Sequence, residues 1–160
     1  MTIKYFDGDL TIRHSTIIDA IEMAPNLRKE EIDEVKASDG MTTLEALLFG
    51  YNNSQACYTA IYKGKPIAMF GHLPISLIGQ KSVVWMLTTP DVLKIKKKFM
   101  ILSKKIINYL LEMYPYLTNY VDARYSQSIK WLKWCGAEIG PAEKYGPYGY
   151  PFHPFLFKRS

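Results

Sequence analysis

The chain has 160 residues, of which 48% are hydrophobic and 22% are charged, and its formal net charge at pH 7 is +5. This length suits one domain, over residues 1–160, and no segment approaches the run of about 20 apolar residues that a membrane span needs. The N-terminal segment has neither a basic start nor an apolar core, which argues against a secretory signal.

The cysteines and histidines form no recognisable ligand pattern. Cys57 and Cys135 follow no metal or disulfide spacing, and the three histidines are scattered along the chain. We therefore expect reduced thiols in a cytoplasmic setting, and no metal site. The net charge raises nucleic-acid binding as a possibility, but the lysines gather at residues 94–98 and no nucleic-acid motif accompanies them, so we expect no such partner.

The first half of the chain predicts a strand, three helices and a hairpin. Ser15 is placed to cap the first helix, and Gly40 to close the second, which we expect to be exposed. Thr42 and Glu45 form a capping box that begins the third helix. The expected ranges, in chain order, are 10–13, 16–23, 28–36, 44–48, 55–63 and 67–73, with a turn at 63–65 between the last two.

The second half alternates strands and helices. Apolar residues repeat at three- and four-residue spacing from Phe99 to Met113, which predicts a long amphipathic helix that ends before Pro115. Gly136 is interpreted as a left-handed stop after a shorter helix. Residues 145–157 are rich in aromatic residues and proline, which predicts a rigid loop and an edge strand, or else a docking surface for a protein. The other expected ranges are strands at 83–88, around 121 and at 152–157, and a helix at 127–135.

Residues 119–137 read as a buried strand, a turn and a helix closed by glycine. This motif resembles the one that ends the cofactor half of the GNAT N-acetyltransferases, with Ser128 as the small residue of the helix and Gly136 as its stop. The resemblance covers roughly the whole chain. It implies an α/β, single-domain GNAT-like fold, in which helices flank a mixed central sheet with a splayed central strand pair. Residues 119–121 and 128–133 also resemble GNAT-like proteins of bacteriophages, including the internal virion protein A family of short-tailed phages.

The resemblance implies acetyl-CoA as the cofactor. Met86, Leu87 and Thr88 stand on the strand whose backbone would pair with the pantetheine and polarise the thioester. The following loop, residues 90–99, contains no glycine, whereas the family has a glycine-rich loop that wraps the pyrophosphate there. Lysine ammonium groups would then hold the phosphates instead, and the candidates are Lys94, Lys96, Lys97 and Lys98. The alternative is that these lysines, like Lys104 and Lys105, form the solvated face of an amphipathic helix.

Two hydroxyl groups are the catalytic candidates that the resemblance implies. Tyr125 stands where the family usually has an asparagine, and Leu132 where many members have a general-acid tyrosine. Tyr125 and Ser128 therefore carry the nearest hydroxyls to the expected thioester sulfur. A general base is not identified. His72 and Glu45 are possible bases, although a buried hydrogen-bonded histidine and a capping carboxylate are the competing interpretations.

Trp131 and Trp134 have two interpretations. Either could stack on an adenine ring. In the more usual arrangement, one tryptophan packs on the sheet and the other partly covers the first.

Two functions follow from these observations. The first is an acetyl-CoA-dependent N-acetyltransferase that acts on an amine of a small molecule or a protein, in the cytoplasm of the host if the chain is encoded by a phage. The second is a catalytically degenerate GNAT-fold protein that binds a phage or host partner, either as a virion component or as a host-takeover factor. The lost glycines, asparagine and tyrosine favour the second, and the strand pattern with Ser128 and the basic loop favours the first.

Overall fold

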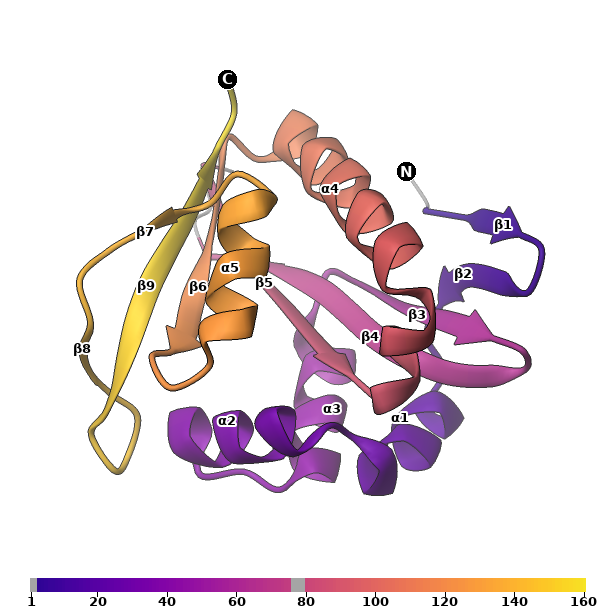
Figure 1. The fold of residues 1–160 in the computed structure, drawn as a ribbon, viewed down its shortest axis with the longest axis horizontal. Coiled ribbons are helices and arrows are strands. Elements are labelled where there is room, and N and C mark those ends of the chain that lie inside the picture. Colours follow the sequence, from indigo (N-terminus) through magenta and orange to yellow (C-terminus); the bar gives the residue numbers. More distant parts are fainter. Residues whose placement is uncertain (1–2, 76–79) are drawn as a thin grey trace. The chain divides into compact units, whose positions relative to one another are not determined.

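The computed structural model describes residues 3–75 and 80–160 (Figure 1). Residues 1 and 2 lie outside the described residues. They begin the N-terminal segment in which we expect no secretory signal. The chain groups into two compact units. The first holds the described residues of 1–36, 41–73 and 85–94, and the second holds those of 37–40, 74–84 and 95–160.

The five helices that the sequence predicts are all present. They are α1 Ile17–Met23, α2 Lys29–Asp39, α3 Thr43–Asn53, α4 Lys96–Met113 and α5 Ser126–Trp134. Of these, α3 continues five residues beyond its expected range, and the other helix ends differ by up to three residues. Two 3-10 helices cover Ala24–Asn26 and Pro90–Ile95. The predicted capping box of Thr42 and Glu45 begins α3, and Gly40 follows α2 with a φ of 68°. These local signals act within one turn of helix, which is why the sequence reveals them.

The first unit contains an antiparallel meander. Its strands, in order along the sheet, are β1 Tyr5–Asp7, β2 Leu10–His14, β3 Ala56–Tyr62, β4 Lys65–Pro74 and the second half of β5 Lys81–Thr88. The hairpin between β3 and β4 turns at Lys63 and Gly64, whose φ angles are 50° and 79°. Two successive positive φ angles are typical of a type I′ turn, which confirms the predicted hairpin.

The second unit contains both parallel and antiparallel pairs. The first half of β5 pairs in parallel with β6 Tyr116–Asp122, and β6 pairs antiparallel with β9 Tyr150–Lys158, which lies beside it in Figure 1. Two short strands, β7 Glu138–Ile139 and β8 Glu143–Tyr145, also pair antiparallel with β9. With helices packed on the strands in both units, the predicted mixed α/β class is confirmed.

Each unit has its own core. In the first, residues from α1, α2 and α3 pack on β3, β4 and β5, and wholly buried members include Ala20, Leu47 and Met69. In the second, α4 and α5 pack on β6 and β9 around Leu117 and Leu132. Leu132, which stands where many GNAT members have a tyrosine, is thus a buried core side chain.

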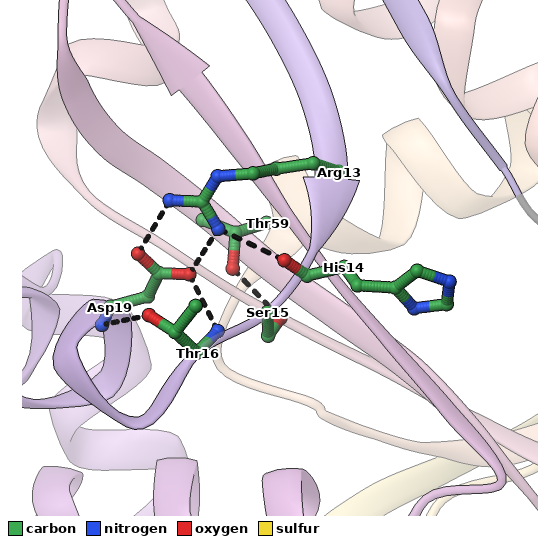
Figure 2. A network of polar contacts seen from close by, with 6 residues as sticks. All are labelled: Arg13, His14, Ser15, Thr16, Asp19 and Thr59. Carbon is green, nitrogen blue, oxygen red and sulfur yellow. Dashed lines mark hydrogen bonds and ion pairs between the residues drawn. The ribbon is translucent and has the colours of Figure 1, made fainter.

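The prediction that Ser15 caps α1 is wrong. Thr16 is the capping residue, since its hydroxyl accepts from the Asp19 N–H while the Asp19 carboxylate accepts from the Thr16 N–H at 2.9 Å. Figure 2 shows that Arg13 of β2 binds the same carboxylate through both terminal nitrogens, at 2.7 and 2.9 Å. Ser15 instead shares a hydrogen bond of 2.7 Å with Thr59 of β3. Both hydroxyls suit a cap, and the pairing of β2 with β3 decides which of them is used.

The prediction of an edge strand near the C-terminus is also wrong. β9 pairs with β6 on one side and with β7 and β8 on the other, so its backbone is hydrogen-bonded on both sides. The strands β7 and β8 are two and three residues long, which is too short for a readable alternation of polar and apolar residues.

Candidate functional site

An open apolar groove of about 430 Å³ lies in the second unit. It is lined by Lys96, Lys97, Met100 and Ile101 from the first turns of α4, and by Trp134 at the end of α5. The side chains of Ile101 and Trp134 are 46% and 45% exposed, so the groove offers apolar surface to a ligand. Its volume lies within the range of small-molecule pockets, roughly 300–1,000 Å³.

The groove contains the N-terminus of α4, which carries unusual charges. Three lysines begin this helix, its first turn has no acidic residue, and its capping residue Ile95 makes no side-chain hydrogen bond to the helix. Cations at a helix N-terminus are unfavourable, because the unpaired N–H groups already give this end a partial positive charge. An anion placed there would be attracted by the N–H groups and by the ammonium groups together.

The predicted phosphate lysines divide into two groups. Lys96 and Lys97 line the groove, whereas Lys94 forms an ion pair of 3.0 Å with Asp91 within the 3-10 helix. Lys98 is exposed in the first turn of α4. The groove therefore brings together two of the four candidates.

The two tryptophans of α5 lie in different environments. Trp131 packs against the second core, and its buried indole N–H has no hydrogen-bond partner among the described residues. Trp134 is half exposed in the groove, and the Lys104 ammonium lies 5.0 Å from the centre of its ring. This cation–π contact helps to hold the indole in place. Lys104 is therefore both part of the solvent-exposed face of α4 and a contact of the Trp134 ring.

The C-terminal end of β5 carries Met86, Leu87 and Thr88 in the first unit. Leu87 is buried in the core, and Thr88 is 2% exposed. The backbone carbonyl of Thr88 accepts from the Arg28 N–H at 3.0 Å, and its hydroxyl donates to Glu31 Oε1 at 3.0 Å. The end of this strand is thus tied to the start of α2.

The described pairing of β5 with β6 covers three residue pairs and stops at Val83 and Thr118. The Asn119 side chain follows, and donates to the Val84 carbonyl at 2.8 Å. β6 continues to Asp122 in its pairing with β9. The described hydrogen-bonded pairing of β5 with β6 thus ends before either strand does, as a splayed strand pair requires.

Glu31 is a candidate that the sequence reading missed. Burial is the largest effect on its carboxyl and, with the nearby Glu34 charge, raises its pKa from 4.5 to about 8, while the Thr88 hydroxyl and Arg28 act in the opposite direction. The helix was predicted to be exposed, yet Val35, four residues after Glu31, is buried. Because residues four apart share a face of a helix, this spacing is the signal that could have revealed Glu31.

Tyr125 and Ser128 lie at the start of α5 in the second unit. Tyr125 is the N-capping residue, and its N–H donates to the Asp122 carbonyl at 3.1 Å. The neighbouring Arg124 guanidinium lies 5.4 Å from the Tyr125 ring centre and also binds the wholly buried Asp122 carboxylate at 2.7 Å. Both hydroxyl-bearing residues are half-buried, so they remain candidates.

The two residues that the sequence suggests as a general base, His72 and Glu45, are placed less favourably for that role than Glu31. His72 is buried in β4, and burial lowers its pKa. Glu45 accepts from the Thr42 N–H at 3.1 Å, which lowers its pKa, and this confirms its role in the capping box.

Solved structures that resemble this chain include several acetyltransferases. A GNAT-family acetyltransferase from Bacillus anthracis has a TM-score of 0.71 and 8% identity, with 98% of each chain covered. A variant of spermidine N-acetyltransferase SpeG from Vibrio cholerae has a TM-score of 0.66 and 13% identity, with 95% of each chain covered. The acetyltransferase MccE, solved with acetyl-CoA and AMP, has a TM-score of 0.68 and 10% identity, over 96% of this chain and 94% of the other. The fold is that of the GNAT acetyltransferases.

Two other comparisons bear on the finer assignment. A family described as "Bacteriophage T7, probable scaffold protein Gp13" matches residues 67–142. No curated protein matches the sequence. The resemblance to the internal virion protein A type is not confirmed by these matches. Within the described part of the chain, no helix combines the length and the apolar character that crossing a membrane requires.

Proposed function

We propose that this protein binds acetyl-CoA and transfers the acetyl group to the amine of a small molecule or a protein. The fold of the GNAT acetyltransferases supports the reaction class, and a relative of this fold has been solved with acetyl-CoA. The observation that carries the proposal is the apolar groove at the start of α4, where the side chains of Lys96 and Lys97 lie beside the half-exposed indole of Trp134.

The groups in the groove fit the chemistry of the coenzyme. Phosphates are matched by the Lys96 and Lys97 ammonium groups and by the positive end of the α4 dipole. The adenine ring is matched by the half-exposed face of Trp134. The segment expected to be a loop, residues 90–99, is instead the 3-10 helix Pro90–Ile95 followed directly by α4, and it contains no glycine. No glycine-rich loop wraps the pyrophosphate there, so the lysines would take a larger share of its binding.

The remaining roles are assigned to the end of β5 and the start of α5. Acetyl-CoA supplies an activated acetyl thioester when it is bound. The backbone of Met86, Leu87 and Thr88 would align the pantetheine, with Met86 and Leu87 doing more because the Thr88 carbonyl already accepts from Arg28. Tyr125 and Ser128 would offer their hydroxyls to the leaving sulfur.

The test of this function is coenzyme binding by calorimetry and by thermal shift. At about 100 times its dissociation constant, a ligand that binds only the folded protein adds roughly 2.7 kcal/mol of stability. We expect the Lys96→Ala/Lys97→Ala variant to bind CoA at least tenfold more weakly and with a smaller salt dependence, and Trp134→Ala to lose affinity without a change in salt dependence. The exposed pair Lys130→Ala/Lys144→Ala serves as the matched control, with unchanged affinity.

The outcomes separate binding from catalysis. Absence of any shift at millimolar acetyl-CoA, or unchanged affinity in the Lys96→Ala/Lys97→Ala variant, would refute the coenzyme site. Coenzyme binding without acetyl transfer to a broad panel of amines and lysine peptides would refute the reaction.

A second function is favoured by one observation. The family model that matches residues 67–142 is described as a probable scaffold protein, which agrees with a GNAT-fold protein that binds a phage or host partner in the host cytoplasm or in a virion. This function predicts that the fold is retained and that acetyl-CoA neither stabilises the protein nor is consumed by it.

A further inference from the structure

Two hydrogen bonds attach the start of α2 to the last residue of β5. The Arg28 N–H donates to the Thr88 carbonyl, and the Thr88 hydroxyl donates to Glu31 Oε1, each at 3.0 Å. Because Thr88 is 2% exposed and sits at the end of a paired strand, it is a rigid anchor. The carboxyl of Glu31 is therefore held at the strand end in one orientation.

Among the described residues, the contacts of this carboxyl are made to one of its two oxygens. Thr88 contacts Oε1, and the Arg28 guanidinium lies 3.9 Å from the same atom. Oε2 accepts no hydrogen bond from any residue in the described part of the chain. The side chain is 14% exposed, so it is mostly desolvated but can still be reached by a small polar group.

The charged groups that face Glu31 are Glu34, Arg28 and Glu30. Burial and then Glu34 raise the pKa of Glu31 to about 8, against the effects of the Thr88 hydrogen bond and Arg28. A carboxylate with a pKa near the working pH is a far stronger proton acceptor than an exposed one with a pKa near 4.3.

We propose that Glu31 is the general base that removes the proton from the acceptor amine, with Thr88 as its positioning residue. This rests on the proposed acetyl transfer, in which the thioester lies along β5 at residues 86–88. The amine nitrogen forms a bond to the acetyl carbon, and the carbon–sulfur bond breaks with its electron pair leaving on sulfur. Glu31 Oε2 takes the proton that the nitrogen loses. The leaving thiolate takes one proton from solvent and Glu31 later returns one to solvent, so the protons balance.

The competing carboxylates and imidazole have other surroundings. Glu45 is fully exposed and serves as the cap of α3, and His72 is buried within β4. Glu30 is paired with Arg28 at 3.4 Å and its side chain is 46% exposed. Unlike Glu30 and Glu45, Glu31 combines burial, a fixed orientation and an oxygen left open for the substrate.

The test compares Glu31→Gln with Glu30→Gln, the same change one residue earlier on the same helix. Glutamine keeps an oxygen for the Thr88 hydroxyl and cannot accept a proton. We expect Glu31→Gln to bind acetyl-CoA as the wild type does and to lose about 10²-fold or more in the rate of acetyl transfer, because general bases contribute about 10² to 10⁴. Glu30→Gln should stay within about twofold of the wild type. Thr88→Val should lower the rate less than Glu31→Gln does.

A second readout needs no coenzyme. A carboxyl whose folded pKa is raised stabilises the fold fully below the unfolded value of 4.5, and this stability is lost as the pH rises to about 8. Chemical denaturation should show this loss in the wild type and in Glu30→Gln, and a flatter profile in Glu31→Gln.

These outcomes keep the two proposals apart. A wild-type transfer rate in Glu31→Gln would overturn the role of Glu31 and leave the acetyltransferase standing. Coenzyme binding without transfer in every variant, the wild type included, would overturn both. An identical pH dependence of unfolding in the wild type and Glu31→Gln would contradict the titration on which the role of Glu31 depends.

Discussion

The side-chain amide of Asn119 donates a hydrogen bond of 2.8 Å to the Val84 carbonyl, just beyond the Val83–Thr118 pair of the parallel ladder between β5 and β6. The amide oxygen accepts from the Tyr120 N–H at 2.8 Å. One side chain thus caps the point where the backbone pairing of these two strands ends.

We expect Asn119→Asp to lower the free energy of unfolding by about 1–3 kcal/mol at pH 7, because a carboxylate cannot donate to the Val84 carbonyl. The effect should shrink near pH 3, where the protonated acid can donate. Chemical denaturation measures both values. Asn53→Asp is the matched control, since Asn53 makes the same kind of bond to Phe49 at an exposed position and should matter less. Equal losses in the two variants would contradict a special role for Asn119.

Gly136 follows α5 with a φ of 106°, as the sequence predicts. A Cβ added there meets no atom within 4 Å, so the cost of a side chain is conformational alone. Gly136→Ala should destabilise the protein by about 1 kcal/mol, and Gly136→Val should also lower the melting temperature. D-alanine at this position, introduced by ligation at the preceding Cys135, should not destabilise. Equal effects of the two alanine enantiomers would refute the explanation.

The ion pair of Arg13 and Asp19, drawn in Figure 2, should make the free energy of unfolding depend on pH in the acid range. Burial acts to raise the pKa of Asp19, but the Arg13 and Thr16 hydrogen bonds outweigh it and the pKa is lowered. The resulting stability is present above the unfolded value of 3.8 and is lost as the pH falls. Asp19→Asn should cost about 1–3 kcal/mol at pH 7 and less near pH 3. Asp91→Asn, which breaks an exposed pair with Lys94, should cost less than about 1 kcal/mol.

Tyr125 can be tested by deleting its hydroxyl alone. Tyr125→Phe keeps the ring that lies beside Arg124 and removes only the hydroxyl. If the hydroxyl serves the leaving sulfur, the rate of acetyl transfer should fall at least tenfold, or about 1.4 kcal/mol in the barrier. Release of the CoA thiol measures this rate. The exposed Tyr148 provides the control in Tyr148→Phe, and a wild-type rate in Tyr125→Phe would remove Tyr125 from the mechanism.

Much of the fold can be predicted because its signals are local. The repeat from Phe99 to Met113 gives α4, the box of Thr42 and Glu45 gives the start of α3, and Gly136 gives the end of α5. The errors occur where a distant partner decides. Thr16 replaces Ser15 as the cap of α1 because Thr59 of β3 engages Ser15, and β9 is interior because the short strands β7 and β8 pair with it.

The sequence by itself determined the order of helices and strands, the basic start of α4 and the absence of a glycine-rich loop, since each of these depends on residues close together in the chain. Only the tertiary structure decided that Trp134 joins Lys96 and Lys97 in one groove, and that Glu31 meets Thr88 across 57 positions. Burial and charge proximity are properties of the packed chain. A carboxyl on a helix rich in charged residues therefore becomes a weak acid, and a candidate base, only when the helix docks on the end of a strand.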